Sequence, residues 1–397
     1  MTPNSIGRLV ALGAFALGMA SYVTAGLLPL IQQDLQLSVA LAAHLVTAFA
    51  LADGLLSPVV VAMLPGHWLR RGLLTALSLF VVANIASALS QQLWTLLAWR
   101  ALTGVCAGVY MALGITAANA SVAPDQRSRT TARIMAGMAS GTVLGVPLGL
   151  VLANHAGWPA AFWLIATLAA VALIGLWRVL PALTTTSVPI TRKLAMLKDR
   201  RVMPVILVSL MAAIASLGMY TFLAPFLQAV DGDGVLPLPL VLWVWGLGGI
   251  AGSTLIGPVA ERMDDARLTG YLATLLTLAL AALPIIGHLQ PWLLLLPVAL
   301  WGAVGWAFQV PQNGALLTAR QDHGDGSLAV ALNGSALYLG SALGASAGGV
   351  VFLLQWPVWT LAVLAAALAG LATLVQWQLW RRAPVTAPYA PDTAAVD

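Results

Sequence analysis

Long apolar runs separated by short polar gaps dominate this sequence of 397 residues. Six runs fall in the first half, at 10–30, 41–64, 73–89, 93–122, 134–152 and 160–180, and six in the second, at 204–227, 237–259, 268–289, 292–317, 328–354 and 359–380. Each run approaches or exceeds the roughly 20 apolar residues that a helix needs to cross a hydrocarbon core. The pattern predicts an all-α membrane protein with 12 transmembrane helices.

Basic residues occur almost only in alternate gaps between these runs. They are Arg8, Arg70, Arg71, Arg127, Arg129, Arg133, Arg262, Arg267, Arg320, Arg381 and Arg382, together with those of the central segment 192–201. Cationic loops stay in the cytoplasm, so both termini are predicted to be cytoplasmic, whereas Asp34, Asp231 and Asp233 are predicted outside.

Composition agrees with a membrane location and argues against other partners. With 60% hydrophobic and 8% charged residues, the chain has too little polar surface for water. The net charge of +5 is spread over loops that face anionic lipid headgroups, so we expect membrane lipid and no nucleic acid as a partner. Cys106 is the single cysteine and lies within a run, so no disulfide forms inside the chain.

The two halves of the chain resemble each other in the spacing of glycine and proline. Gly141, Gly145 and Gly149 recur 199 residues later as Gly340, Gly344 and Gly348. The repeat predicts two pseudo-symmetric six-helix halves, at 1–182 and 203–382, joined by a cytoplasmic linker with an amphipathic helix at 183–202 and followed by a disordered tail at 383–397. Glycines four apart let a second helix approach closely, either as fixed packing or as a moving contact between the halves; their pairing favours the moving contact.

These features together resemble the major facilitator superfamily, specifically its bacterial 12-span drug/proton antiporter branch, which includes arabinose and other sugar exporters. The resemblance rests on Gly26, Leu27, Leu28, Pro29 and Asp34, on Arg100, Gly104 and Gly108, on Gly141, Gly145, Pro147 and Gly149, and on the segments 220–227 and 333–349. It implies the major facilitator fold, alternating access, a bacterial inner membrane location and a monomer. It also implies a gating role for the glycine-rich fifth and eleventh runs, Pro147 included.

Two departures from the family pattern matter. Family members carry an Asp-Arg pair with trailing basic residues in the loop between the second and third runs, and this chain lacks the acid there, at 64–71. The signature is better kept in the second half as Glu261, Arg262 and Arg267. These charges either have a gating role or merely set the orientation in the membrane. The acidic residue that many members of the branch carry in the first run is replaced by Ser21 and Tyr22.

Asp53 is the only carboxylate inside a run, and Arg100 lies inside another. A rise of ~1.5 Å per residue places Asp53 at a depth of ~18 Å and Arg100 at ~10 Å, which a long arginine bridges only if the run ends shift. Burial in a low dielectric favours the protonated form of a carboxylate, which can exchange a proton as solvent access changes. We expect Asp53 to replace the missing acid and Arg100 to assist proton coupling; a permanent structural pair is the alternative.

Polar side chains within the runs are the candidates for substrate binding. They are Thr24, Tyr110, Tyr220, Gln309, Gln312, Asn313, Asn333 and Tyr338, with Trp243, Trp245, Trp301 and Trp306 as aromatic walls. With a single buried acid, a neutral or weakly charged small molecule fits better than a strong cation.

Three classes of function follow. The first is a secondary active exporter of a small organic molecule such as a drug, sugar or metabolite, exchanged for protons. The second is an uncoupled facilitator or importer, which the missing first-run acid keeps open. The third, a membrane enzyme, would need clustered carboxylates or histidines, and none occur. No metal-ligand spacing and no phosphate-binding loop are present either, so we expect no cofactor, no metal and no direct use of ATP.

Overall fold

This computed structural model describes residues 4–181, 183, 196, 198–230, 234–323 and 325–382. In the first half the helices are α1 (Asn4–Asp34), α2 (Val39–Leu51), α3 (Ser57–Met63), α4 (Leu69–Ala88), α5 (Leu93–Ala120), α6 (Arg127–Ser140), α7 (Val146–Ala156) and α8 (Pro159–Val179). In the second half they are α10 (Val202–Thr221), α11 (Leu223–Val230), α12 (Leu238–Ala260), α13 (Asp265–Leu289), α14 (Leu295–Ala307), α15 (Gln309–Ala319), α16 (Gly326–Leu353) and α17 (Thr360–Arg382).

Several of these helices join into single spans. The π-helical turn Ala52–Leu56 links α2 to α3, and the π-helical turn Gly141–Gly145 links α6 to α7. Over the described ranges, 12 helical stretches are long and apolar enough to cross a membrane. The prediction of an all-α membrane protein with twelve spans in two halves is therefore confirmed. The predicted amphipathic linker helix falls mainly at residues outside those ranges, as does the predicted tail.

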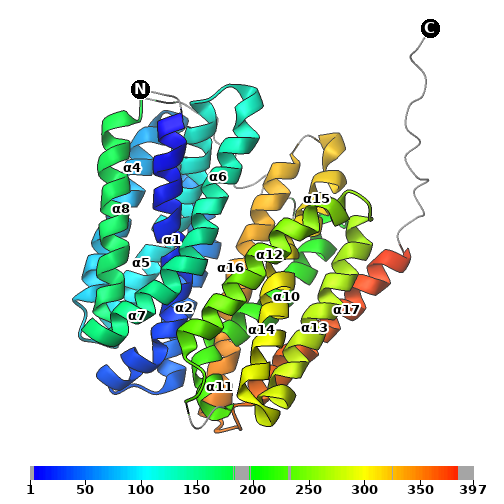
Figure 1. Cartoon of the computed structure of the whole chain (residues 1–397). Coiled ribbons are helices and arrows are strands. Elements are labelled where there is room, and N and C mark those ends of the chain that lie inside the picture. Colours follow the sequence, from blue (N-terminus) through cyan, green and yellow to red (C-terminus); the bar gives the residue numbers. More distant parts are fainter. Residues whose placement is uncertain are drawn as a thin grey trace.

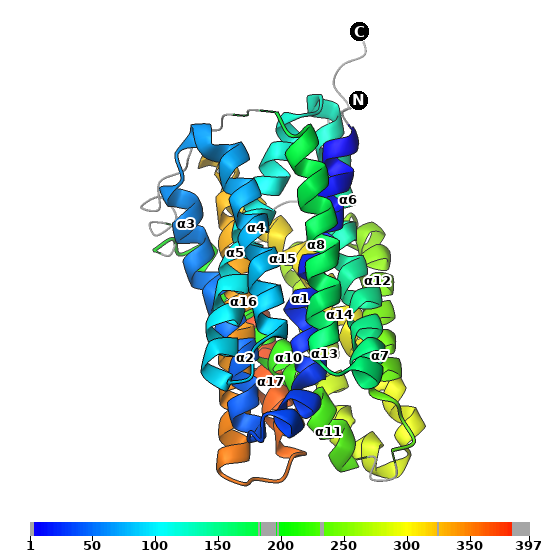
Figure 2. The same cartoon turned by 90° about the vertical axis from the view of Figure 1, so that its left-hand side faces the viewer.

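The main contacts between the halves lie at one end of the bundle. There α2 packs on α16, α7 on α12, and α1 on α11. Figure 1 shows the halves side by side, meeting at the lower end and diverging toward the upper end, where α1 begins and α17 ends. Figure 2, turned by 90°, shows α2 and α11 at the same lower end. We call the lower end the closed end; Arg8, Arg70 and Arg127 lie at the starts of α1, α4 and α6, toward the opposite end.

The glycine repeats pack helices inside each half rather than between the halves. A Cβ atom at Gly141 would collide with the backbone carbonyl of Phe15 in α1, and one at Gly344 would come within 2.5 Å of the Ile214 carbonyl in α10. Phe15 and Ile214 are themselves 199 residues apart, so the contact is duplicated together with the glycines.

The remaining glycines of the repeat behave in the same way. Gly145 and Gly149 face Met19 of α1, while Gly340 and Gly348 face Ala213 and Phe222 of the second half. The expected moving contact between halves is thus corrected: backbones approach closely within each half because packing, not hydrophobic burial, holds helices together in lipid. Pro147 lies buried just after the π-helical turn Gly141–Gly145, inside the fifth span, where its ring cannot donate a backbone hydrogen bond.

One ion-pair cluster joins helix ends of the second half that face away from the closed end. The Arg320 Nη1 atom lies 2.6 Å from Asp199 Oδ2, and its Nε atom lies 2.8 Å from Asp325 Oδ1. The backbone N–H of Arg201 and then the Arg320 guanidinium hold the pKa of Asp199 below its usual range. The Arg320 guanidinium holds the pKa of Asp325 below its usual range as well. The cluster ties the start of α10 to the α15–α16 turn.

These lowered pKa values predict a pH dependence of stability. A carboxylate whose folded pKa is depressed stabilises the fold above its unfolded pKa of about 3.9, and the contribution is lost as the pH falls through the folded pKa. Replacing Arg320 by Gln should therefore lower the unfolding temperature at pH 7 and flatten its fall below about pH 4. Thermal unfolding in detergent at pH 7 to 3 measures this. Identical pH profiles for the variant and the parent would contradict it.

Candidate functional site

Asp53 lies in the middle of the second span, at the π-helical turn between α2 and α3. The Ser57 hydroxyl, four residues on, donates to the Asp53 backbone carbonyl at 2.6 Å and lies 3.4 Å from its carboxylate Oδ1. On the other side, Gly108 of α5 leaves the space that the carboxylate occupies, because a Cβ there would collide with Asp53 Oδ1 and with Ser57 Oγ. Single π-helical turns are frequent at functional sites.

The Asp53 carboxyl is shielded from the lipid and lies next to the junction of the two halves. Asp53 is only 6% exposed. Next to it, a Cβ at Gly54 would lie 3.1 Å from the Ser335 carbonyl and 3.2 Å from the Tyr338 Cβ, both on α16 of the second half. Tyr22 of α1 and Tyr338 are close enough to interact electrostatically with Asp53. An acid of the first half thus lies close to a tyrosine of each half.

Arg100 is fully buried in the first half but is not paired with Asp53. Its Nη2 atom donates to the Ala20 carbonyl at 2.9 Å, and its guanidinium lies 4.6 Å from the Phe49 ring centre and 5.6 Å from that of Phe162. Its Nε and Nη1 atoms have no hydrogen-bond partner in the described structure.

The absence of that pair has a geometric cause. Gly104 of α5 contacts Phe49 of α2, and Gly108 contacts Asp53, so the two helices run in parallel and in register. Arg100 precedes Gly108 by two helical turns, which is ~12 Å along the axis toward the closed end. The pair of Arg100 and Asp53, which the sequence left open, is therefore not formed in this conformation.

An aromatic cluster connects the first half to the second beside Asp53. The ring centres of Tyr22 and Tyr220 are 5.4 Å apart in an edge-to-face arrangement, and those of Tyr220 and Trp245 are 4.6 Å apart. Trp301 and Trp306 extend the cluster at 6.0 and 5.8 Å from Trp245. We call these five residues the aromatic cluster. From the sequence, Tyr22 is recognised only as the replacement of an acid; its place in the first span was the signal for a role in the site.

Three of the predicted substrate residues come together in the second half. The Asn333 amide of α16 donates to Asn313 Oδ1 at 2.9 Å and to Gln309 Oε1 at 3.2 Å, both on α15. Asn333 is fully buried, and its own oxygen has no partner in the part of the chain described. Thr24 and Gln312 are also buried and keep a polar atom without a partner there.

Two other predicted positions are placed differently. Tyr110 lies between α5 and α1, where its hydroxyl donates to the Val10 carbonyl at 3.2 Å and its ring fills the space beside Gly13. It is completely buried within the first half, so its expected contact with substrate is corrected to helix packing. Trp243 is 47% exposed on the outer surface and forms no wall of the site.

The charged loop between α12 and α13 does not bridge the halves. Arg267 packs against Tyr271 and Trp380 of its own half, with ring centres 5.7 and 5.8 Å from the guanidinium. Glu261 and Arg262 are exposed, and no ion pair involves them among the described residues. In this conformation the expected gating contact of Glu261, Arg262 and Arg267 is not formed, because the halves lie apart on this side.

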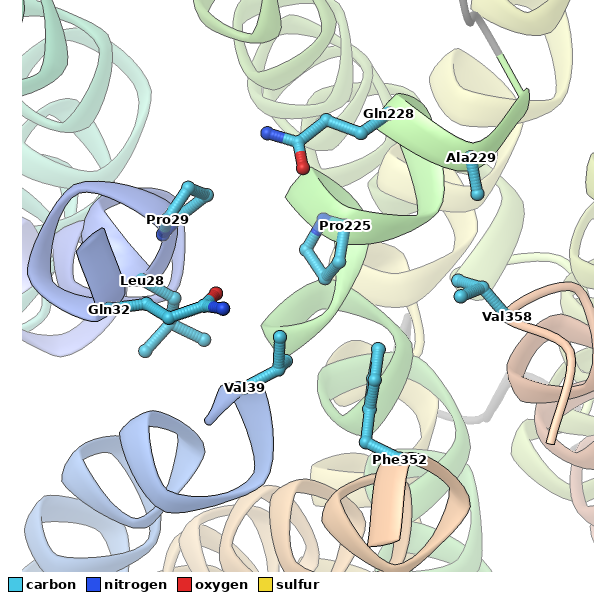
Figure 3. A pocket seen from close by; sticks show the side chains of 9 residues that line it. All are labelled: Leu28, Pro29, Gln32, Val39, Pro225, Gln228, Ala229, Phe352 and Val358. Atoms are coloured by element: carbon cyan, nitrogen blue, oxygen red, sulfur yellow. The ribbon is translucent and has the colours of Figure 1, made fainter. Parts of the chain in front are cut away.

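At the closed end a small pocket of about 370 Å³ lies between the halves. It is lined by Leu28, Pro29, Gln32, Val39, Pro225, Gln228, Ala229, Phe352 and Val358. Figure 3 shows that Gln32 of α1 and Gln228 of α11 extend their amides into the space between these two helices. Pro29 and Gln32 correspond to Pro225 and Gln228 at a constant offset of 196. Equivalent residues of the two halves therefore line the pocket from both sides.

Comparison with known proteins agrees with this architecture. The chloramphenicol resistance protein of Streptomyces lividans is 32% identical over 75% of this chain and 77% of its own length. The inner membrane transport protein YdhP of Escherichia coli K12 is 28% identical over 86% of this chain and 87% of its own. Among solved structures, the nucleoside transporter NupG superposes with a TM-score of 0.77 at 12% identity, covering 96% of this chain and 100% of that one.

The sequence profile of the Major Facilitator Superfamily matches residues 10–324. That match covers most of the chain, and the two relatives align with it along 77% and 87% of their own length. The chain therefore belongs to the major facilitator superfamily, whose members transport small molecules across membranes and are not enzymes.

Proposed function

We propose that this transporter exports a small organic molecule across the bacterial inner membrane in exchange for protons. The observation that carries the proposal is the position of Asp53: a buried acid of one half, next to the junction with the other, and close to Tyr22 and Tyr338. The charge of a carboxyl in such a place acts on both halves, so its protonation can affect how they contact each other. Small-molecule transport itself follows from the family.

The proton cycle follows from burial and changing access. While Asp53 is shielded from water, its neutral form is favoured because an isolated charge in a low dielectric is unfavourable. When the halves separate on its side, water stabilises the carboxylate and the proton leaves. Opening of the closed end would let a proton in from the other side, and the neutral acid would then favour the release of cargo.

Arg100 acts on this cycle at a distance. As a positive charge buried in the same half, Arg100 favours the carboxylate form of Asp53. Arg100 thereby helps the proton to leave Asp53, so that the acid can exchange its proton in each cycle. The partnerless nitrogens of Arg100 also allow it to bind a new acceptor when the halves rearrange.

The cargo is proposed to be neutral or weakly charged. The aromatic cluster offers ring faces and edges, and Asn333, Gln309 and Asn313 offer amides for orientation. Tyr338, Thr24 and Gln312 complete the proposed contacts. With Asp53 committed to protons, no second buried acid remains among the described span interiors to hold a strong cation. A relative named as a chloramphenicol resistance protein supports a drug-like cargo and the outward direction.

The membrane orientation is part of the proposal. The basic starts of α1, α4 and α6 lie on the side where the halves diverge, and cationic loops remain in the cytoplasm. We therefore place both termini inside and regard the present conformation as open toward the cytoplasm. Residues 1–182 and 203–382 are the two bodies that rock, with 183–202 as their tether, in a monomer.

One observation supports the alternative, an uncoupled facilitator or importer: the first span carries Ser21 and Tyr22 where an acid is expected. A compound screen in liposomes containing the purified protein separates the two. Each hit is tested for counterflow with and without a pH gradient, while the internal pH is recorded. Proton movement opposite to the compound supports exchange, and compound movement without any pH change supports the facilitator.

A further inference from the structure

We propose that an anionic phospholipid binds between α13 and α17, with its phosphate on Arg267 and one acyl chain in the groove below it. Arg267 lies near the start of α13, and the groove runs along the outward face of these two helices. Figure 1 shows α17 beside α13 at the edge of the second half, away from the first. The proposal concerns this outer surface and is independent of the transport site.

The groove is shaped for hydrocarbon. It has a volume of about 530 Å³ and is lined by Thr274, Thr277, Leu278, Ala367, Gly370, Leu371, Thr373 and Leu374. The hydroxyls of Thr277 and Thr373 share a hydrogen bond of 3.1 Å, and Thr274 donates to the Gly270 carbonyl at 2.8 Å. Because these hydroxyls already have partners, an acyl chain can cover them without leaving a polar group unpaired.

Arg267 offers a cation without a competing carboxylate. Its Nη2 atom donates to the Tyr271 hydroxyl at 3.2 Å, and the rings of Tyr271 and Trp380 hold the guanidinium on two sides. The nearby Asp264 carboxylate instead accepts the backbone N–H of Arg267 and caps α13. No ion pair to Arg267 forms within the described ranges. A planar guanidinium held in place is well suited to bind a phosphate through two hydrogen bonds.

The spacing of cation and groove matches a phospholipid. Thr274 follows Arg267 by seven residues, so the groove begins ~10 Å further into the membrane. The headgroup layer of one leaflet is about 5 to 7 Å thick, which places the phosphate level with Arg267 and the first methylenes level with the groove. Trp377 spans the gap: its ring lies against Gly270, and its indole N–H donates to Thr274 at 3.3 Å. Exposed Arg381 adds positive charge at the same level.

Native mass spectrometry of the whole transporter in detergent tests the site, with phosphatidylglycerol and phosphatidylcholine as probes. We expect one phosphatidylglycerol to be retained at concentrations where phosphatidylcholine is not. Arg267→Gln should weaken that binding about tenfold, the equivalent of one charge-assisted hydrogen bond of about 1.4 kcal/mol. Gly370→Leu should weaken it by filling the groove.

Matched controls come from the neighbouring helix. Arg262→Gln removes an exposed cation of the same loop, and Gly257→Leu adds a leucine at a surface glycine with open space around it. Both should bind the lipid as the parent does. Equal retention by Arg267→Gln, equal binding of phosphatidylcholine, or full displacement by glycerophosphoglycerol, which lacks acyl chains, would each overturn the proposal. Arg267 is exposed, so Arg267→Gln should fold. It therefore tests the proposal even if Gly370→Leu fails to fold.

Discussion

Replacing Asp53 by Asn should abolish proton-driven transport while leaving the protein folded and inserted. In the parent protein, each exchanged proton supports about a tenfold cargo gradient per pH unit, since one pH unit is worth about 1.4 kcal/mol. The variant should carry cargo only to equal concentrations on both sides. Asn fills the same space beside Gly108 and Ser57, so the loss would come from the proton and not from packing.

The measurement is cargo accumulation in liposomes under an imposed pH gradient, together with counterflow at equal pH. Asp125→Asn, which removes an exposed acid from a loop of the same half, is the matched control and should accumulate cargo normally. Should Asp53→Asn still build a gradient that depends on pH, Asp53 is not the proton carrier and the proposed coupling fails.

A disulfide across the closed end should stop transport. Thr47 of α2 and Ser346 of α16 belong to different halves, and their hydroxyl oxygens are 3.3 Å apart. Cysteines at both positions should oxidise readily, because side-chain atoms this close lie within the reach of a disulfide. The bond would hold the halves together at this end, so the opposite conformation could not form. We expect transport to fall to the background rate and to recover on reduction.

The control is a cysteine pair inside one half. Asn119 and Thr131 are joined by a hydrogen bond of 2.9 Å between the end of α5 and α6, and both belong to the first half. Their disulfide should leave transport intact, since that half is proposed to move as one body. The natural Cys106 is buried and should not interfere. If the Thr47→Cys, Ser346→Cys disulfide forms fully and transport continues, rocking of the halves about this contact is wrong.

The fold could be predicted from the sequence because a membrane imposes simple rules. Every span must form its backbone hydrogen bonds internally, so a long apolar run by itself predicts a helix. The duplicated glycines predicted the two halves. In the structure, the residues that these glycines contact, Phe15 and Ile214, are repeated at the same offset. In this conformation these glycines contact helices of their own half, which the sequence could not predict because spacing reveals a smooth helix face but not which helix lies against it.

The candidate site was only partly predictable for a similar reason. Counting depth along each helix placed Asp53 near the middle of the membrane and Arg100 at a different depth, but it could not show whether the run ends shift enough for the two to pair. Tyr110 satisfies the same sequence criteria as Tyr338, yet Tyr110 packs inside the first half and Tyr338 lies at the contact between the halves, next to Gly54. A polar residue within a span has a known depth and an unknown direction.

Sequence alone determined the class of this protein, its twelve spans, its duplication and the rarity of its buried charges. These are properties of each helix and its solvent, so they can be read locally. Only the tertiary structure decided that Asp53 lies close to tyrosines of opposite halves, that Arg100 is not paired with it, and that the glycines pack helices within each half. Those facts depend on how helices distant in sequence are rotated against one another, and in lipid that rotation is selected by close packing over the whole bundle.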